Sequence, residues 1–289
     1  MRNSKTNELV LTGLFTAIII IMAFTPLGYI PLVVINATII HIPVILGSLF
    51  CGPKKGAFLG FVFGFTSCLK ATIVGGTLSS FVFSPVLAAS LVGTSGIFKS
   101  LFIAFVPRIL VGVIPYFVYI GIKKVLASEK KNLWGTVLNV LMSVFLSFGV
   151  YAFLGKMSES LSQAAALGIG IAVGAVVFIV VEAVFIRKST QVIPFVYAGV
   201  AGAMTNTLLV MGSIFVLYKD AYADAIGVAG NAVLGVITGV ISFNGVIEAI
   251  VAAIIVYLVG LVLNTIKPIA AKINSDRFKN KCEIVCTAD

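Results

Sequence analysis

Residues 9–53 read LVLTGLFTAIIIIMAFTPLGYIPLVVINATIIHIPVILGSLFCGP and contain no Lys, Arg, Asp or Glu. A bilayer core is about 30 Å thick and needs about 20 apolar residues per helix, so this run is long enough for two helices. Two prolines, a glycine and an asparagine between positions 26 and 36 interrupt its middle. We therefore predict two membrane helices, at about 9–25 and 37–52, of which the second is short.

Further uncharged stretches follow along the chain. Residues 56–69 form the next one. The long uncharged stretch 71–98 is rich in Gly, Ser, Thr and Pro, and we expect its first half to be a loop folded into the membrane surface. The remaining predicted spans lie at about 100–122, 133–155, 161–186, 194–218 and 241–266, which gives eight helices.

The composition of the 289 residues agrees with this pattern. Hydrophobic residues make up 60% of the chain, charged residues make up 10%, and the mean hydropathy is +1.16. Soluble domains are roughly 45–50% apolar and about 25% charged. The composition excludes a disulfide scaffold, a disordered chain and a soluble enzyme, and it predicts an all-α polytopic membrane protein.

The formal net charge of +10 has a simple explanation in the topology. If the N-terminus is cytoplasmic, short cytoplasmic loops and tails carry fifteen of the twenty basic residues, as the positive-inside rule requires, and both termini are cytoplasmic. We therefore expect these basic residues to lie at the lipid bilayer, and we do not expect the protein to bind nucleic acid. The fifteen are Arg2, Lys5, Lys54, Lys55, Lys123, Lys124, Lys130, Lys131, Arg187, Lys188, Lys267, Lys272, Arg277, Lys279 and Lys281.

The predicted hairpin 133–186 differs from the other spans. It is rich in Val, Ala and Gly and lies between two basic clusters, so its removal would leave six helices with unchanged topology. We interpret it as an inserted transmembrane hairpin that faces lipid. The predicted division of the chain is 1–132 for the first helices and outer loops, 133–188 for the inserted hairpin, 189–268 for the last two core helices, and 269–289 for a cytoplasmic tail.

Ionisable groups inside membrane spans are costly, so each of them is a candidate for function. Arg108 must meet an anion, a carboxylate or a watery cavity. Glu248 is its natural counterpart, and Asn244, four residues earlier, shares its helix face. The two charged residues either pair with each other as structural elements or share a binding pocket.

Other polar residues join this set. His41, the single histidine, shares a face with Thr38 and is either a structural histidine or a substrate ligand. Thr205, Asn206 and Thr207 place three hydrogen-bonding side chains in one helix, which favours a pocket. The sequence has no second histidine and no intramembrane cysteine pair at the spacing of metal ligands that could complete a metal site, so a metal is not expected. No other cofactor is expected either.

Two further charged residues, Lys70 and Glu182, lie in or near predicted spans. Lys70 either reaches outward to the membrane interface or contacts a ligand. Glu182 lies near the cytoplasmic end of the inserted hairpin, and we expect it to reach Arg187 or Lys188.

Several functional classes find little support. The chain has no phosphate-binding Gly-x-x-x-x-Gly-Lys-Ser/Thr loop, so it cannot itself be a nucleotide-driven pump. Residues 93–96 read Gly-Thr-Ser-Gly, as in intramembrane serine proteases, but His41 precedes them where such proteases need a later histidine. We therefore do not expect an enzyme. A self-sufficient ion-coupled carrier, with Arg108 and Glu248 as its relay, stays open as an alternative.

With these residues in hand, the chain resembles the substrate-binding (S) components of energy-coupling factor (ECF) vitamin transporters over about 1–125 and 190–266. The resemblance rests on six motifs: Thr38-Ile-Ile-His41-Ile-Pro-Val-Ile, Gly52-Pro-Lys-Lys-Gly56-Ala, Leu78-Ser-Ser-Phe-Val-Phe, Pro107-Arg108-Ile-Leu-Val-Gly112, Ala201-Gly-Ala-Met-Thr205-Asn206-Thr207-Leu and Asn244-Gly-Val-Ile-Glu248-Ala.

The resemblance implies a six-helix protein of the bacterial plasma membrane that holds one vitamin near its outer face. It implies docking to a membrane-embedded coupling (T) subunit served by two cytoplasmic ATPases, through a small-xxx-small motif whose place Gly13 and Ala17 occupy. The hairpin 133–186 departs from six-helix members and either faces lipid or alters docking. The motifs are most similar to members assigned to pantothenate, while riboflavin, folate and cobalamin members share the fold. The implied substrate-binding residues are Asn36, Thr38, His41, Arg108, Thr205, Asn206, Asn244 and Glu248.

Overall fold

The computed structural model describes residues 4–31, 36–75, 79–157, 161–187 and 192–262. The chain is helical almost throughout, and two three-residue strands pair antiparallel, with Tyr29 opposite Thr38. The elements are α1 (Ser4–Phe24), η1 (Pro26–Gly28), β1 (Tyr29–Pro31), β2 (Asn36–Thr38), α2 (His41–Cys51), α3 (Pro53–Ile73), η2 (Ser80–Val82), α4 (Pro85–Val92), α5 (Thr94–Val111), α6 (Ile114–Leu126), α7 (Lys131–Met157), α8 (Gln163–Arg187), α9 (Ile193–Ile226), α10 (Val233–Val240) and the π-helical turn η3 (Ile241–Gly245), which continues as helix over 246–262.

The prediction of a polytopic all-α membrane protein is confirmed. Within the described ranges, six helical segments are long and apolar enough to cross a bilayer. Two shorter apolar helices, Glu8–Phe24 and His41–Cys51, correspond to the two that residues 9–53 predicted. The six long segments are Pro53–Ile73, Thr94–Leu126, Lys131–Gly155, Gln163–Ala183, Ile193–Ile226 and Val233–Val262.

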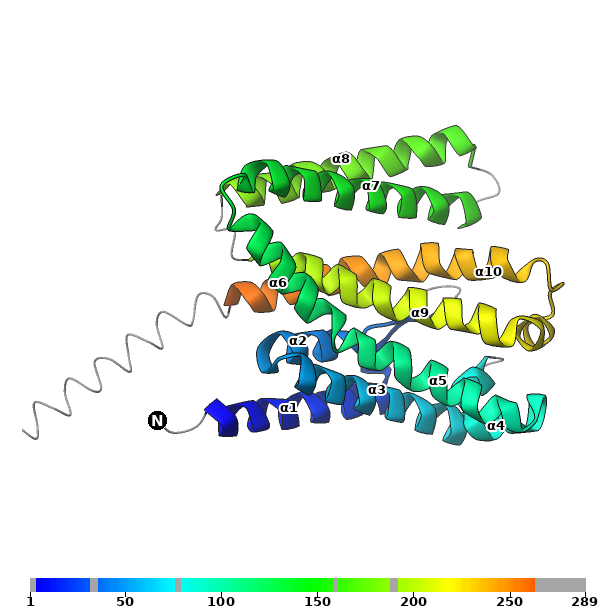
Figure 1. The fold of residues 1–289 in the computed structure, drawn as a ribbon. Coiled ribbons are helices and arrows are strands. Elements are labelled where there is room, and N and C mark those ends of the chain that lie inside the picture. The colour runs from blue at the N-terminus through cyan, green and yellow to red at the C-terminus, as the bar shows by residue number, and fades with distance from the viewer. Residues whose placement is uncertain (1–3, 32–35, 76–78, 158–160, 188–191, 263–289) are drawn as a thin grey trace, which may run out of the picture.

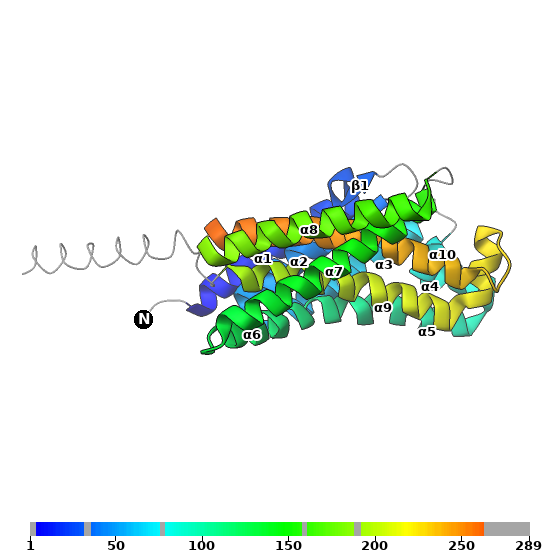
Figure 2. The same ribbon diagram turned by 90° about the horizontal axis from the view of Figure 1, so that it is seen from above.

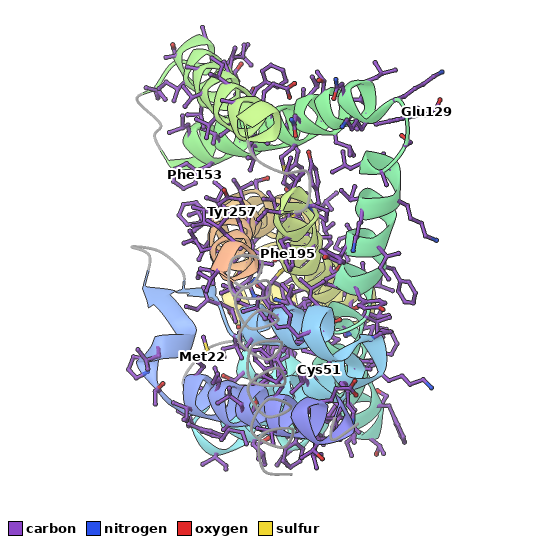
Figure 3. All side chains as sticks on the ribbon, turned by 90° about the vertical axis from the view of Figure 1, so that its left-hand side faces the viewer. Met22, Cys51, Glu129, Phe153, Phe195 and Tyr257 are labelled. Carbon is purple, nitrogen blue, oxygen red and sulfur yellow. The ribbon has the colours of Figure 1, made fainter. Side chains whose placement is uncertain are left out.

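The helices lie in three layers that share one long direction (Figures 1 and 2). The α7–α8 hairpin forms one outer layer, α9 and α10 form the middle layer, and α1, α2 and α3 form the other outer layer (Figures 1 and 3). Helices α5 and α6 cross from the layer of α1, α2 and α3 toward the α7–α8 hairpin (Figures 1 and 3). The start of α1, the α2–α3 junction and the α6–α7 junction lie at the same end (Figure 1). The two junctions carry six of the lysines assigned to the cytoplasmic side. Which end faces the cytoplasm stays a prediction.

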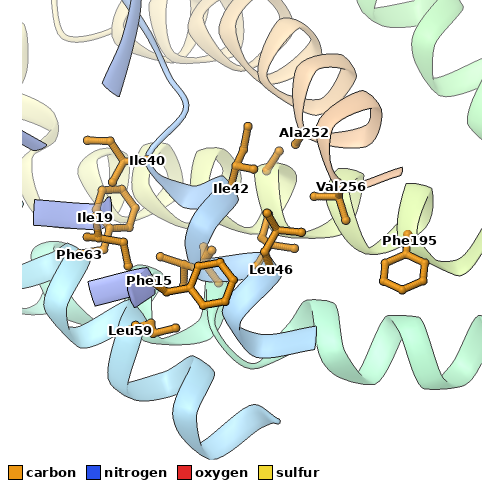
Figure 4. Close-up of a cluster of buried hydrophobic side chains, with 14 of the residues drawn as sticks. Phe15, Ile19, Ile40, Ile42, Leu46, Leu59, Phe63, Phe195, Ala252 and Val256 are labelled. Atoms are coloured by element: carbon orange, nitrogen blue, oxygen red, sulfur yellow. The ribbon is translucent and has the colours of Figure 1, made fainter. Parts of the chain in front are cut away.

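The main core lies between α1, α2, α3, α9 and the helix over 246–262. Phe15, Ile19, Ile42 and Leu59 meet there, and every residue from 41 to 48 of α2 is buried (Figure 4). Because α2 is enclosed by other helices, it does not need the length of a lipid-exposed span. The short second helix predicted from the sequence is therefore a central packing element.

The structure differs from the sequence prediction around residues 71–122. The half of the 71–98 stretch that was predicted as a loop contains the end of α3 and the short helix η2, and the second half is helical in α4 and the start of α5. The predicted span 100–122 begins six residues earlier. That span is broken between α5 and α6 at Gly112, where a Cβ atom would collide with the backbone of Gly56 on α3. The chain bends where two helices approach to backbone contact, which the hydropathy of either segment does not reveal.

Glu182 also has partners other than those expected. Its carboxylate accepts hydrogen bonds from Thr136 Oγ1 at 2.8 Å and from Asn139 Nδ2 at 2.5 Å, both on α7. The expected contact with the side chains of Arg187 or Lys188 lies outside the described residues. In the described part of the chain, Glu182 thus joins the two helices of the hairpin, whose boundaries as an inserted module stay a prediction.

Candidate functional site

A cavity of about 520 Å³ lies between α3, α5, α9 and α10, with β2 and η2 at its border. This volume falls within the range of about 300–1,000 Å³ that is usual for small-molecule sites. Polar and apolar side chains share its wall. The lining residues are Thr38, Phe63, Ser67, Lys70, Ala71, Gly75, Ser79, Ser80, Phe83, Arg108, Asn206, Thr207, Val210, Met211, Tyr222, Val240, Asn244 and Glu248.

Glu248 joins three elements at this cavity. Its Oε1 accepts a hydrogen bond from the backbone N–H of Thr38 in β2 at 2.8 Å, and its Oε2 accepts one from Thr207 Oγ1 in α9 at 2.7 Å. The side chain is 5% exposed. A buried carboxylate is stable only where donors replace the lost water, and each carboxylate oxygen has a second lone pair that can accept from a ligand.

Arg108 is held by the irregular geometry of its own helix. Pro107 has no N–H, so the carbonyl of Ile103, four residues earlier, lacks its helical partner. Arg108 Nη1 donates to that carbonyl at 2.6 Å. The guanidinium carbon lies 4.6 Å from the ring centroid of Phe83 and 5.5 Å from that of Phe63, within cation–π range. The Pro-Arg pair of the sequence therefore places a positive charge between two aromatic rings of the cavity wall.

Glycines of α3 allow α5 to approach closely enough for this arrangement. A Cβ atom at Gly60 would collide with the carbonyl oxygen of Arg108, and one at Gly64 would collide with that of Ala104. Small residues four apart permit such backbone contact between membrane helices. The spacing of Gly56, Gly60 and Gly64 could have revealed this contact from the sequence.

Two amide side chains, those of Asn206 and Asn244, add acceptor oxygens to the wall of the cavity. Asn206 of α9 and Asn244 of η3 are each 7% exposed, and neither Oδ1 atom has a hydrogen-bond partner in the described part of the chain. Buried acceptors are almost always satisfied in native proteins. Two such oxygens on the wall of one cavity indicate a ligand that donates hydrogen bonds.

Lys70 bonds to the protein itself, and contact with a ligand stays a prediction. It lines the cavity near the end of α3, and its Nζ donates to the carbonyl of Ala23 at the end of α1 at 2.9 Å. The cavity therefore has two cationic side chains, one carboxylate and two amides on its wall. This set suits a small polar molecule that carries a negative charge and several hydroxyl or N–H donors.

The cavity gathers five of the eight predicted substrate-binding residues: Thr38, Arg108, Asn206, Asn244 and Glu248. Thr38 contributes through its backbone N–H. Thr207, which is not among the eight predicted residues, also lines the cavity and donates its hydroxyl to Glu248.

The other three predicted residues are not among those that line it. Thr205 donates its hydroxyl to the carbonyl of Ala201 at 2.6 Å, within its own helix. His41 is completely buried at the start of α2, close to the backbone of Thr38, and neither ring nitrogen makes a hydrogen bond of standard geometry to a described residue. The side chain of Asn36 lies outside the described residues. Sequence position within a helix did not show which member of 205–207 faces inward, because only packing fixes the rotation of α9.

The predicted docking residues differ from the cavity residues in their exposure. Gly13 and Ala17, one turn apart on α1, are exposed, and a Cβ atom at Gly13 would meet nothing within 4 Å. Ser95 of the protease-like tetrapeptide is exposed at the start of α5 and donates to the carbonyl of Val92 at 3.4 Å. The completely buried His41 cannot act on an exposed Ser95 as a general base.

Comparisons with known proteins agree with the geometry. The family described as "ECF transporter, substrate-specific component" matches residues 7–186, a range that includes the α7–α8 hairpin. The chain is 42% identical over 161 residues to the "Pantothenic acid transporter PanT" of Lactococcus lactis subsp. cremoris, covering 52% of this chain and 78% of that protein. It is 37% identical over 119 residues to the "Pantothenate transporter PanT" of Leuconostoc mesenteroides subsp. mesenteroides, covering 39% of this chain and 51% of that protein.

These relatives are transporters, as is the family, so the prediction that the chain is not an enzyme is confirmed. The spans of the structure and the relatives together make it a multi-pass protein of the bacterial plasma membrane. The chain belongs to the substrate-specific (S) components of ECF transporters.

Proposed function

We propose that the protein captures pantothenate in the cavity between α3, α5, α9 and α10 and delivers it to an ATP-driven ECF transporter. The observation that carries the proposal is the combination, on the wall of one cavity, of cationic side chains with two acceptor oxygens that have no partner in the described part of the chain. Both named relatives are pantothenate transporters, which favours this vitamin over riboflavin, folate or cobalamin.

The chemistry of pantothenate matches the cavity group by group. Its carboxylate suits the guanidinium of Arg108 or the ammonium of Lys70, since charge-assisted hydrogen bonds are the strongest available. Its two hydroxyls and its amide N–H are donors, and Asn206 Oδ1, Asn244 Oδ1 and the free lone pairs of Glu248 are acceptors. Its methyl groups find apolar surface at Val210 and Met211.

Transport requires partners that the chain does not contain. Its sequence lacks a phosphate-binding loop, so we propose that ATP is hydrolysed by two cytoplasmic ATPase subunits that act through a membrane-embedded T subunit. The exposed pair Gly13 and Ala17 on α1 supports a docking face, because small exposed residues allow close approach of a partner helix.

Binding is tested with the purified chain in detergent or nanodiscs by titration calorimetry. Pantothenate should bind, and panthenol, in which an alcohol replaces the carboxylate, should bind at least about tenfold more weakly because it lacks the charge. Equal affinity for the two ligands would contradict a charge-based site, and no binding of pantothenate would reject the substrate.

Coupling is tested by reconstitution into liposomes. Uptake of labelled pantothenate should require the T subunit, both ATPases and ATP. Uptake by the chain alone, driven by a proton or sodium gradient, would reject the ECF mechanism and favour the ion-coupled carrier.

A further inference from the structure

The α7–α8 hairpin is attached to the α9–α10 layer by specific contacts (Figure 3). Near the start of α7, Asn139 is 1% exposed, donates to Glu182 of α8, and accepts a hydrogen bond from Tyr197 OH of α9 at 2.8 Å. A chain of hydrogen bonds thus runs from α8 through α7 to α9. A hairpin that only faced lipid would not need to bury an asparagine and a tyrosine hydroxyl against the core.

The second attachment is at η3, the π-helical turn between α10 and the helix over 246–262, and at Val246, which follows it directly. Gly149 of α7 lies against Val246, and a Cβ atom at position 149 would collide with that valine side chain. One turn further along α7, the ring of Phe153 lies 4.3 Å, centroid to centroid, from the ring of Phe243 at an interplanar angle of 34°. Gly149 permits α7 to approach this segment closely, and the rings of Phe153 and Phe243 pack in the interface.

The same π turn carries part of the candidate site on its other side. Asn244 follows Phe243 directly, lines the cavity, and presents an Oδ1 without a described partner. Glu248 lies one helical turn further on. α7 and the cavity therefore contact different residues of one short segment.

A π turn needs support from its surroundings. It contains one residue more than the α-helix around it, is rare, and occurs mostly at functional sites. If η3 relaxed to regular α-helix, the helix that follows it would rotate by about 100° about its axis relative to the helix that precedes it. One residue turns an α-helix by that angle. Such a rotation would move Asn244 or Glu248 off the cavity wall.

We propose that α7 is a positioning element of the binding site: Phe153 and Gly149 hold the π turn in shape and thereby keep Asn244 directed into the cavity. The hairpin is then part of the binding apparatus of this protein. The claim about the π turn is independent of the ligand, whereas its effect on affinity rests on the proposed function.

The first experiment measures the π turn without ligand, by hydrogen–deuterium exchange of the protein in nanodiscs. Phe153→Ala should accelerate amide exchange in residues 241–248 by about tenfold or more, because it removes a packing contact that opposes local opening. The matched control is Phe148→Ala on the same helix, where the ring is 64% exposed, and it should leave these amides unchanged. Equal exchange in the two variants would overturn the proposal.

A second pair of variants covers the case in which Phe153→Ala does not fold. Gly149→Ala introduces a methyl group against Val246, whereas Gly155→Ala introduces one where nothing lies within 4 Å. Only the first should change exchange in residues 241–248, and a change of equal size in both would overturn the proposal.

The second experiment measures pantothenate affinity in a double-mutant cycle. Phe153→Ala should weaken binding by about five- to thirtyfold in the otherwise unchanged protein, and by less than about twofold once Asn244→Ala is present, because contacts that act as one unit are not additive. In the Asn206→Ala background the full loss should persist. A loss that persists in both backgrounds would show that Phe153 supports the fold in general and would reject its action through Asn244.

The two experiments separate the two proposals. If the wild type does not bind pantothenate and exchange still distinguishes Phe153→Ala from Phe148→Ala, the substrate is wrong and the support of the π turn stands. If the wild type binds pantothenate and exchange does not distinguish them, the substrate stands and the role of α7 is rejected.

Discussion

The carboxylate of Glu248 accepts a hydrogen bond from the backbone N–H of Thr38 at 2.8 Å, across 210 positions of sequence. Its other oxygen accepts from Thr207 of α9. One acidic side chain therefore joins the strand that precedes α2 to two helices near the end of the chain. A ligand that bound to Glu248 would contact this junction directly, which makes it the natural place to begin testing the site.

Replacing Glu248 with leucine should loosen the strand. The change leaves the N–H of Thr38 and the hydroxyl of Thr207 without their acceptor, and a lost hydrogen bond to a charged group costs about 1.5–3 kcal/mol. We expect a lower midpoint of thermal unfolding in detergent and faster amide exchange at Thr38. Glu248→Gln, which keeps one carbonyl oxygen, should have an intermediate effect. Unchanged exchange at Thr38 in Glu248→Leu would contradict the junction.

Replacing Arg108 should separate charge recognition from folding. Arg108→Ala removes a guanidinium from the cavity wall, and we expect pantothenate to bind about 10- to 100-fold more weakly, as for the loss of a charge-assisted hydrogen bond of about 1.5–3 kcal/mol. Calorimetry with panthenol is the control, since a ligand without a carboxylate should lose much less affinity. An equal loss of affinity for both ligands would mean that Arg108 stabilises α5, through its hydrogen bond to the carbonyl of Ile103, and does not recognise the carboxylate.

Neighbouring residues of α9 should differ sharply. Asn206→Ala removes an acceptor from the cavity and should weaken pantothenate binding by about tenfold, which corresponds to about 1.4 kcal/mol, a typical hydrogen-bond contribution. Thr205→Ala should change affinity by less than about twofold, because that hydroxyl already bonds within its own helix. Titration of the two purified variants with pantothenate measures both affinities. A larger loss of affinity in Thr205→Ala than in Asn206→Ala would mean that α9 is rotated relative to the structure.

Gly13 provides a test of docking that does not involve the cavity. Gly13→Leu places a bulky side chain on the exposed face of α1, and we expect unchanged pantothenate affinity but at least about tenfold slower ATP-driven uptake in proteoliposomes, because a helix interface built on small residues excludes it. Gly155→Leu, also at an exposed glycine with open space around it, is the matched control and should transport normally. Normal uptake with Gly13→Leu would remove α1 from the docking surface.

Much of the site was accessible from the sequence because charge is scarce in this chain. Arg108 and Glu248 are conspicuous as charges inside apolar runs, and Asn244 shares a helix face with Glu248. Thr38 and Asn206 stand out through other local patterns, the spacing to His41 and the polar run 205–207. Thr207 and Lys70 are not among the predicted substrate-binding residues, since a polar residue in a helix faces a cavity or its own backbone according to a rotation that no local pattern specifies. Phe63 and Phe83, which flank the guanidinium, were indistinguishable from other aromatic residues of the core.

The sequence by itself determined the membrane class, the positions of the apolar helices and the short list of costly buried groups, because the cost of transferring each residue into a bilayer depends on that residue and its near neighbours. Tertiary structure alone decided the break at Gly112, the π turn that carries Asn244 and the contact of α7 with that turn. Each of these depends on how closely two helices approach and how each is rotated about its axis. Approach and rotation are set by packing between segments far apart in the chain, so no single segment contains them.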